Sequence, residues 1–185
     1  MKEGTSTFLQ VDLQNMYTYN QKIDFEKLWD HFNERETETL IGSVVYTIRS
    51  HEFDSTRFET KLKSIGFDIR TKSFTKVKRS RDILPNLDVL ITMECLIRKD
   101  LFDKWILVSN NGAYADLCKY LREIGKTVEI WCFRDSYDPN LELYADKLHF
   151  LDDNLCLRKQ SIAVFGINTF QECADRFDST AWRPR

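Results

Sequence analysis

The sequence predicts one α/β domain in which a central, mostly parallel β-sheet of about five strands carries helices on both faces. Three observations point to this fold. Strand-like and helix-like segments alternate along the chain with short connections, which is the order that builds parallel sheets. The 185 residues, 42% of them hydrophobic, are enough for one buried core. With 6 Gly and 3 Pro, the chain has too few of either for a linker-rich or low-complexity protein.

The first half of the chain alternates strand and helix. Thr7–Leu13 is an apolar run containing an acid near its end, and it predicts a buried strand. Asp24–Glu36 has apolar residues at helical spacing and a polar opposite face, so a helix is expected. Leu40–Arg49 is rich in β-branched and aromatic residues, as strands are. Ser55–Ile65 predicts a helix closed by the glycine that follows it, and Phe67–Thr71 a short strand.

The second half continues the same alternation. Leu87–Arg98 is nearly all apolar, and its length favours a buried helix over a strand. Trp105–Ser109 predicts a strand that runs into an Asn-Asn-Gly turn. Ala113–Ile124 predicts a helix closed by a glycine, and Thr127–Phe133 predicts the next strand.

The last elements set the expected domain boundary. Asn140–Leu148 is expected to be a helix and His149–Leu151 a last short strand. We therefore expect a domain over residues 1–153 and a C-terminal extension over residues 154–185. Within that extension, Ser161–Phe170 could form an added strand.

The charge balance argues against a general affinity for nucleic acid. The 27 Lys+Arg and 29 Asp+Glu leave a formal net charge of −2, so any nucleic-acid site must be a local patch. One such patch lies between Arg70 and Arg81, where basic residues occur without an acid. It could contact a phosphate backbone, and it could equally be a solvated loop. Its members are Arg70, Lys72, Lys76, Lys78, Arg79 and Arg81.

The cysteines and the hydropathy predict a cytoplasmic protein without a membrane span. The five cysteines include no C-x-x-C pair, so reduced thiols are expected rather than a disulfide framework. No signal peptide is evident, and no apolar run reaches the roughly 18 residues that a membrane span needs.

Polar residues gather where the predicted strands end. The first strand contains Asp12, with Asn15 three residues later, and another strand ends in Ser109, Asn110 and Asn111. Asp88 opens the apolar helix. The carboxyl ends of parallel strands share one sheet edge, and carboxylates that converge there suit Mg²⁺. Each acid also has an ordinary explanation, since Asp12 could cap the following turn and Asp88 the helix.

Glu94 lies within the apolar run LITMECLI and is expected to be buried. A buried carboxylate costs several kcal/mol unless it is paired or binds a metal. Glu94 therefore either takes part in a metal site or pairs with a basic side chain. Asp88 and Glu94 lie about 120° apart on a helix, so a shared ion is not guaranteed.

Several blocks of sequence together resemble the NYN domain family, in particular its LabA-like branch. The resemblance runs from about Phe8 to Asp153 and implies a PIN-like three-layer sandwich. Many members of the family are Mg²⁺- or Mn²⁺-dependent ribonucleases that act through clustered acids, which implies that RNA is the substrate. The blocks are FLQVDLQNMY, LKSIGFDIRTK, LDVLITMECL, WILVSNNGAYADLCKYLREIGKTVEIWCF and LELYADKLHFLDD.

The resemblance also assigns roles to individual residues. It implies Asp12, Asp88 and Asn111 as metal ligands, and Glu94 stands where the family usually has Asp. The family block Ser-Gly-Asp-Gly-Asp-Phe is Ser109–Tyr114 here, and both of its acids are missing, at Asn111 and Ala113. The implied catalytic residues are Asp12, Asp88, Glu94 and Asp116, the last by similarity to the CCCH zinc-finger ribonucleases. Asn15 and Asn111 are expected to position water or phosphate and the basic loop is expected to hold RNA, so the expected substrate-binding residues are Asn15, Ser109, Asn110, Asn111, Lys76, Lys78, Arg79 and Arg81.

Two functional hypotheses follow. The first is a metal-dependent endoribonuclease, weakened or inactivated by the missing acids. The second is a degenerate domain that binds RNA or a protein partner, including a second copy of itself, through aromatic residues such as Trp131, Tyr137 and Tyr144. A small-nucleotide-binding protein is disfavoured because no glycine-rich loop is present.

Overall fold

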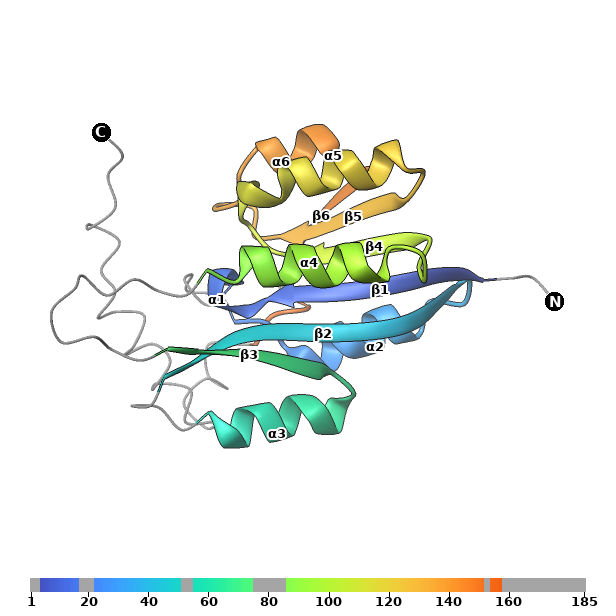
Figure 1. Ribbon diagram of the computed structural model, residues 1–185. Coiled ribbons are helices and arrows are strands. Elements are labelled where there is room, and N and C mark those ends of the chain that lie inside the picture. Colours follow the sequence, from blue (N-terminus) through green and yellow to red (C-terminus); the bar gives the residue numbers. More distant parts are fainter. Residues whose placement is uncertain (1–3, 17–21, 51–54, 75–85, 152–153, 158–185) are drawn as a thin grey trace, which may run out of the picture.

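The computed structural model describes residues 4–16, 22–50, 55–74, 86–151 and 154–157 (Figure 1). Its centre is a six-stranded sheet in the order β3-β2-β1-β4-β5-β6. The strands are β1 (Thr5–Asp12), β2 (Glu38–Ser50), β3 (Asp68–Phe74), β4 (Lys104–Val108), β5 (Thr127–Cys132) and β6 (Lys147–Phe150). The helices are α1 (Leu13–Met16), α2 (Phe25–Asn33), α3 (Thr56–Ile65), α4 (Asp88–Arg98), α5 (Ala115–Glu123) and α6 (Asn140–Tyr144), with a 3₁₀ turn η1 (Gly112–Tyr114).

The expected fold class is confirmed. Every pair of neighbouring strands in the sheet is parallel. The sheet has six strands where about five were expected, and the sixth, β6, overlaps the expected short strand His149–Leu151 and starts at Lys147. The expected strand over Ser161–Phe170 lies outside the described residues.

The last helix is shorter than the sequence suggests. We expected it to reach Leu148, but it ends at Tyr144. Asp146 explains the difference: its N–H donates to the Val128 carbonyl at 2.9 Å, and its carboxylate accepts from the Val128 N–H at 2.8 Å. These two bonds attach the chain to the start of β5, so the next residues continue as β6 instead of a helical turn.

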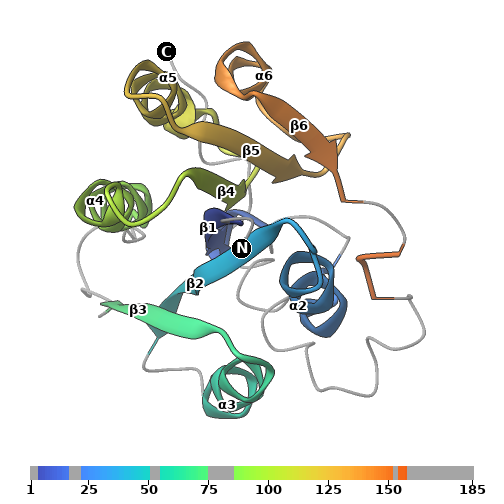
Figure 2. The ribbon, with the colours of Figure 1, turned by 90° about the vertical axis from the view of Figure 1, so that its right-hand side faces the viewer.

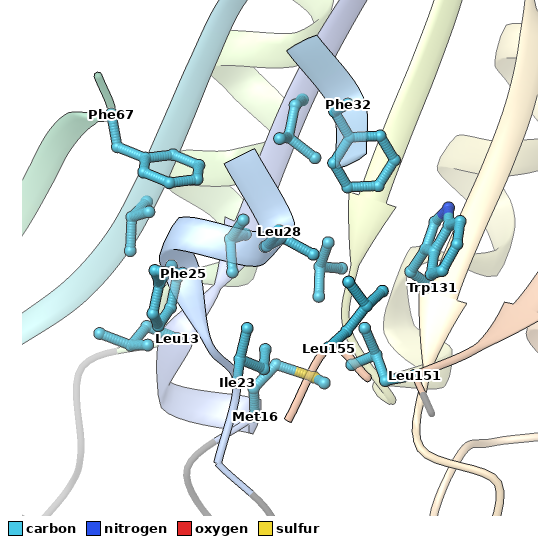
Figure 3. Packing of buried hydrophobic residues seen from close by; sticks show 14 of the residues in the cluster. Leu13, Met16, Ile23, Phe25, Leu28, Phe32, Phe67, Trp131, Leu151 and Leu155 are labelled. Atoms are coloured by element: carbon cyan, nitrogen blue, oxygen red, sulfur yellow. The ribbon is translucent and has the colours of Figure 1, made fainter. Parts of the chain in front are cut away.

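The two faces of the sheet carry separate cores. Figure 2 shows α2 and α3 on one face and α4, α5 and α6 on the other. Trp131, which we considered as an interface residue, is 7% exposed and belongs to the core on the α2 side (Figure 3). That core includes Leu9, Val11, Leu28, Phe32 and Phe67, and the opposite core includes Phe8, Tyr46, Ile91, Trp105 and Leu121.

The first residues of the expected C-terminal extension take part in the α2-side core. Leu155 and Cys156 are buried there, and Cys156 forms an antiparallel bridge with Ile23. The Asp24 N–H donates to the Leu155 carbonyl at 2.8 Å, and the Leu157 N–H donates to the Lys22 carbonyl at 2.7 Å. The described chain therefore ends on the face of the sheet opposite α4.

The strand order fixes where a site can form. From β1 the chain proceeds outward through β2 and β3, and from β4 it proceeds outward in the opposite direction through β5 and β6. The connections that leave β1 and β4 at their carboxyl ends therefore diverge, which opens a crevice between two adjacent strands. Ligands of open α/β sheets bind at such a switch point.

Two glycines with positive φ offer a test of local packing. A Cβ on Gly66 (φ 127°) would lie 2.5 Å from the Trp29 ring, whereas a Cβ on Gly125 (φ 82°) would meet nothing within 4 Å. We expect Gly125→Ala to lower the free energy of unfolding by about 1 kcal/mol through backbone strain alone. Gly66→Ala should cost about 3 kcal/mol, since the indole must also move. Urea denaturation of both variants measures the difference, and equal losses would contradict it.

Candidate functional site

The candidate site lies at the carboxyl ends of β1 and β4, beside the start of α4. Asp12 is the last residue of β1, and Ser109–Asn111 follow β4 directly. Asp88 is the first residue of α4, and Tyr114 is the last residue of η1. The hydrogen bonds described below connect these segments, which are far apart in the sequence.

Asp12 is 2% exposed and accepts three hydrogen bonds from neutral donors. Its Oδ1 accepts from the Asn15 N–H at 3.2 Å, while its Oδ2 accepts from the Tyr114 hydroxyl at 3.0 Å and from Ser109 Oγ at 3.4 Å. Burial raises the pKa of this carboxyl to about 6, against the lowering effect of these bonds, and the nearby Asp88 adds to the rise. The bond from the Asn15 N–H means that Asp12 caps the turn that follows β1, which is the ordinary role expected for this acid.

The Tyr114 hydroxyl lies between the two site acids. It is 3.0 Å from Asp12 Oδ2 and 3.2 Å from Asp88 Oδ1, and the side chain is fully buried. A phenol carries one proton, so it donates to only one carboxylate at a time. A proton on Asp12 completes the chain, because Asp12 then donates to Tyr114 and Tyr114 donates to Asp88.

Asn111 presents its amide nitrogen, rather than its carbonyl oxygen, to Asp88. Its Oδ1 accepts from the Ala113 N–H at 3.0 Å and so caps η1. A backbone N–H needs an acceptor, and this fixes the orientation of the amide. Its Nδ2 then donates to Asp88 Oδ1 at 3.0 Å. The Asn111 oxygen that was expected to bind a metal thus already accepts one hydrogen bond within the protein.

The neighbouring polar residues hold the strand ends together. Asn110 is 3% exposed; its Oδ1 accepts from the Phe133 N–H at 2.7 Å and its Nδ2 donates to Ser136 at 3.1 Å. The Asn110 N–H donates to Asn15 Oδ1 at 2.8 Å, and Ser109 Oγ accepts from the Asn111 N–H at 3.2 Å. These four expected substrate-binding residues are brought together, and each takes part in bonds within the protein.

Glu94 belongs to a different network. Its carboxylate accepts from Arg70 at 3.1 Å and from the Tyr46 hydroxyl at 2.9 Å, and it pairs with Arg98 at 3.0 Å. Tyr46 in turn bonds to the buried Gln10. Of the two alternatives for Glu94, the structure shows the one in which basic side chains pair with it.

The remaining expected residues are spread around this edge. Asp116 lies in the first turn of α5 with an exposed side chain. Arg70 is paired with Glu94, and the Lys72 ammonium donates to the Asn86 carbonyl at 3.0 Å. The expected phosphate contacts Lys76, Lys78, Arg79 and Arg81 lie outside the described residues.

The donors available to a cation are therefore few. Asp12 and Asp88 contribute one carboxylate each, and both are hydrogen-bonded to Tyr114. Within the described residues, no group of three or more His, Cys, Asp or Glu side chains is placed to hold a metal ion. Hard cations such as Mg²⁺ favour sites that are rich in charged oxygens. As arranged, these side chains suit a hydrogen-bonded site better than a divalent cation.

Tyr114 is the site residue that sequence reasoning missed. An aromatic residue beside a helix start usually belongs to the core, and the ring of Tyr114 does lie in the α4-side core. Only the hydroxyl reaches the acids. The turn Asn-Asn-Gly before it was visible in the sequence, but the direction of one hydroxyl depends on how three distant segments pack.

The fold and the site together define a three-layer α/β protein with paired acids at the switch point of a parallel sheet. The NYN domain model matches residues 6–152, so the chain belongs to the NYN domain family. A protein of unknown function from Vibrio parahaemolyticus has a similar fold, with a TM-score of 0.75 and 22% identity over 85% of this chain and 99% of that one. The MAR1 ribonuclease from Caenorhabditis elegans aligns with a TM-score of 0.35 and 15% identity, over 78% of this chain and 72% of that one.

No curated protein matches this sequence significantly. In the described part of the chain, no helix combines the length and apolar character needed to cross a membrane. Cys95, Cys118 and Cys132 are buried free thiols, and burial raises the pKa of the Cys118 and Cys132 thiols to about 12.

The raised pKa of Asp12 predicts a pH dependence of stability. The folded state keeps a proton on Asp12 up to about pH 6, whereas the unfolded state releases it near 3.8. Relative to Asp12→Asn, the wild type should lose up to about 3 kcal/mol of unfolding free energy as the pH rises from 4 to 6, then level off. Urea denaturation of both proteins across this range measures the difference. If the unfolding free energies of the two proteins changed with pH in parallel, the pKa of Asp12 would not be raised in the folded state.

Proposed function

We propose that this chain is an RNA-binding member of the LabA-like branch of the NYN family whose capacity for metal-dependent cleavage is strongly reduced. The observation that carries the proposal is the environment of Asp88. One of its oxygens accepts hydrogen bonds from the Asn111 amide and the Tyr114 hydroxyl. Neutral groups thus contact one oxygen of a carboxylate that a ribonuclease of this family would use on a cation.

The physical cost to metal binding comes from both charge and hydrogen bonding. An amide at position 111 brings no negative charge, and its oxygen is already bonded to the Ala113 N–H. A cation would also have to displace the Tyr114 hydroxyl from the two acids. Because Mg²⁺ gives up water reluctantly, each missing charge weakens its binding steeply.

The basic segment supports RNA as the ligand. The segment 75–85 joins the end of β3 to the start of α4, and both of these points lie at the carboxyl edge of the sheet. Arg70 is paired with Glu94, so the phosphate contacts are assigned to the four other basic residues beyond β3. Contacts of this kind bind a backbone without reading its sequence. They are Lys76, Lys78, Arg79 and Arg81.

A second candidate is a Mg²⁺- or Mn²⁺-dependent endoribonuclease. The proximity of Asp12 and Asp88, which share the Tyr114 hydroxyl, favours it. A bound divalent ion would lower the pKa of a water molecule and stabilise charge on the phosphate. Asp12 and Asp88 would hold the ion, Asp116 would add a carboxylate from α5, and Ser109 would orient Asp12 through its hydroxyl.

Cleavage and metal binding distinguish the two candidates. We expect wild-type protein with Mn²⁺ or Mg²⁺ to leave labelled single-stranded RNA essentially intact. In the variant Asn111→Asp with Tyr114→Phe, a carboxylate is added and both acids are released, so calorimetry should show Mn²⁺ affinity rising about tenfold or more. Adding Ala113→Asp should raise it again.

Asp12→Ala is the control for both measurements. In the double variant it should remove the gained Mn²⁺ affinity. Efficient cleavage by the wild type that disappears in Asp12→Ala would establish the endoribonuclease instead, and cleavage that persists in Asp12→Ala would indicate a contaminant.

RNA binding is tested separately by its salt dependence. Replacing Lys76, Lys78, Arg79 and Arg81 with Gln should weaken filter binding of single-stranded RNA and flatten the plot of log K against log [salt]. The slope should fall by roughly 0.7 for each phosphate that is no longer neutralised. The matched control replaces Lys27 and Lys63, two exposed lysines on α2 and α3, and should leave the slope unchanged. If the plots of log K against log [salt] had equal slopes for the two variants, the RNA would not bind to the basic segment.

A further inference from the structure

The outer face of α4 carries a line of exposed apolar side chains. Val89 is 60% exposed, Met93 54%, Ile97 76% and Leu101, in the turn just after the helix, 62%. These residues are spaced by four, so they lie along one side of the helix. We call these four residues the α4 surface.

This surface is unusual for the outside of a soluble domain. The inner side of α4, with Ile91 and Cys95, is completely buried against the sheet. The helix is therefore apolar on both sides, which is typical of a helix that is covered on both sides. In Figure 1, α4 lies in front of the sheet, and no described element packs over it. Contiguous apolar surface of this kind usually marks a contact with another molecule.

The charges around the α4 surface are already paired within the chain. Glu94 pairs with Arg70 and Arg98, Arg70 also pairs with Asp68, and Lys99 pairs with Asp100. The surface therefore offers no excess of charge to an RNA or to a strongly charged peptide. It fits a partner that is itself apolar and electrically balanced at the contact.

The described chain ends on the face of the sheet opposite α4, where the Leu157 N–H donates to the Lys22 carbonyl.

The spacing of the line matches a second copy of the same chain. The line is symmetric about the midpoint between Met93 and Ile97. If a second α4 packs antiparallel across this midpoint, Met93 faces Ile97 of the other copy, and Val89 faces Leu101. Two-fold contacts are self-complementary in this way, and antiparallel packing also brings the opposite ends of the helix dipoles together. We propose that two copies of this chain form a symmetric dimer through antiparallel packing of their α4 surfaces.

The experiment uses the full-length chain and analytical ultracentrifugation over a range of concentrations. Wild-type protein should show a monomer–dimer equilibrium. Met93→Lys and Ile97→Glu should each raise the dimer dissociation constant by about tenfold or more, because each places an unpaired charge in the interface. Leu143→Glu, at an equally exposed leucine on α6, is the matched control and should dimerise like the wild type.

Mixing Met93→Lys with Ile97→Glu tests the antiparallel geometry. In a heterodimer, the lysine introduced at position 93 of one chain would face the glutamate introduced at position 97 of the other. The mixture should therefore dimerise more tightly than either variant alone. Circular dichroism should show the wild-type fold in every variant. A wild type that stays monomeric, variants that still dimerise, or a mixture no better than its components would overturn the proposal.

Discussion

The burial of the Asp12 carboxylate without a counter-charge governs the arrangement of the whole carboxyl edge of the sheet. A buried acid is tolerated only when donors surround it. Here the donors come from three places: the turn after β1, the end of β4 and the start of α5, through Asn15, Ser109 and Tyr114. Satisfying one carboxylate therefore ties together segments about 100 residues apart in sequence. Asn110 extends the same network to the end of β5.

The other buried acids of the described chain are treated differently. Glu129 has a pKa of about 2 although it is 2% exposed, because Arg35 and Lys104 surround it. Among the described residues, Asp12 and Asp88 instead receive only neutral donors. Asp12 therefore carries its negative charge only above about pH 6. The buried or partly buried acids of the described residues that pair with a basic side chain include Glu38, Glu59, Glu94 and Glu129.

The sequence was sufficient for the order and type of the main elements because their patterns are local. An apolar run that stops at an acid defines β1, and the asparagines after β4 mark the turn at the switch point. What could not be predicted depends on contacts across the fold. The apolar run LITMECLI predicts a buried Glu94, and the side chain is partly buried, but the run does not reveal that Arg70 comes to it from β3. The last strand starts at Lys147 instead of His149 because Asp146 bonds to Val128 of the neighbouring strand, which helix propensity does not reveal.

The two sides of α4 connect the site with the proposed dimer contact. Asp88 is the first residue of this helix, and no side chain of Leu87 caps it, although Asn86 Oδ1 accepts from the Asp88 N–H at 2.6 Å. The position of the carboxylate therefore depends on how firmly the helix is held. Ile91 and Cys95 hold its inner side on the sheet. Packing on the outer side would restrain the same helix from the other direction. Because the Tyr114 hydroxyl is held beside Asp12, a shift of α4 would change its distance to Asp88, which links the dimer contact to the geometry of the site.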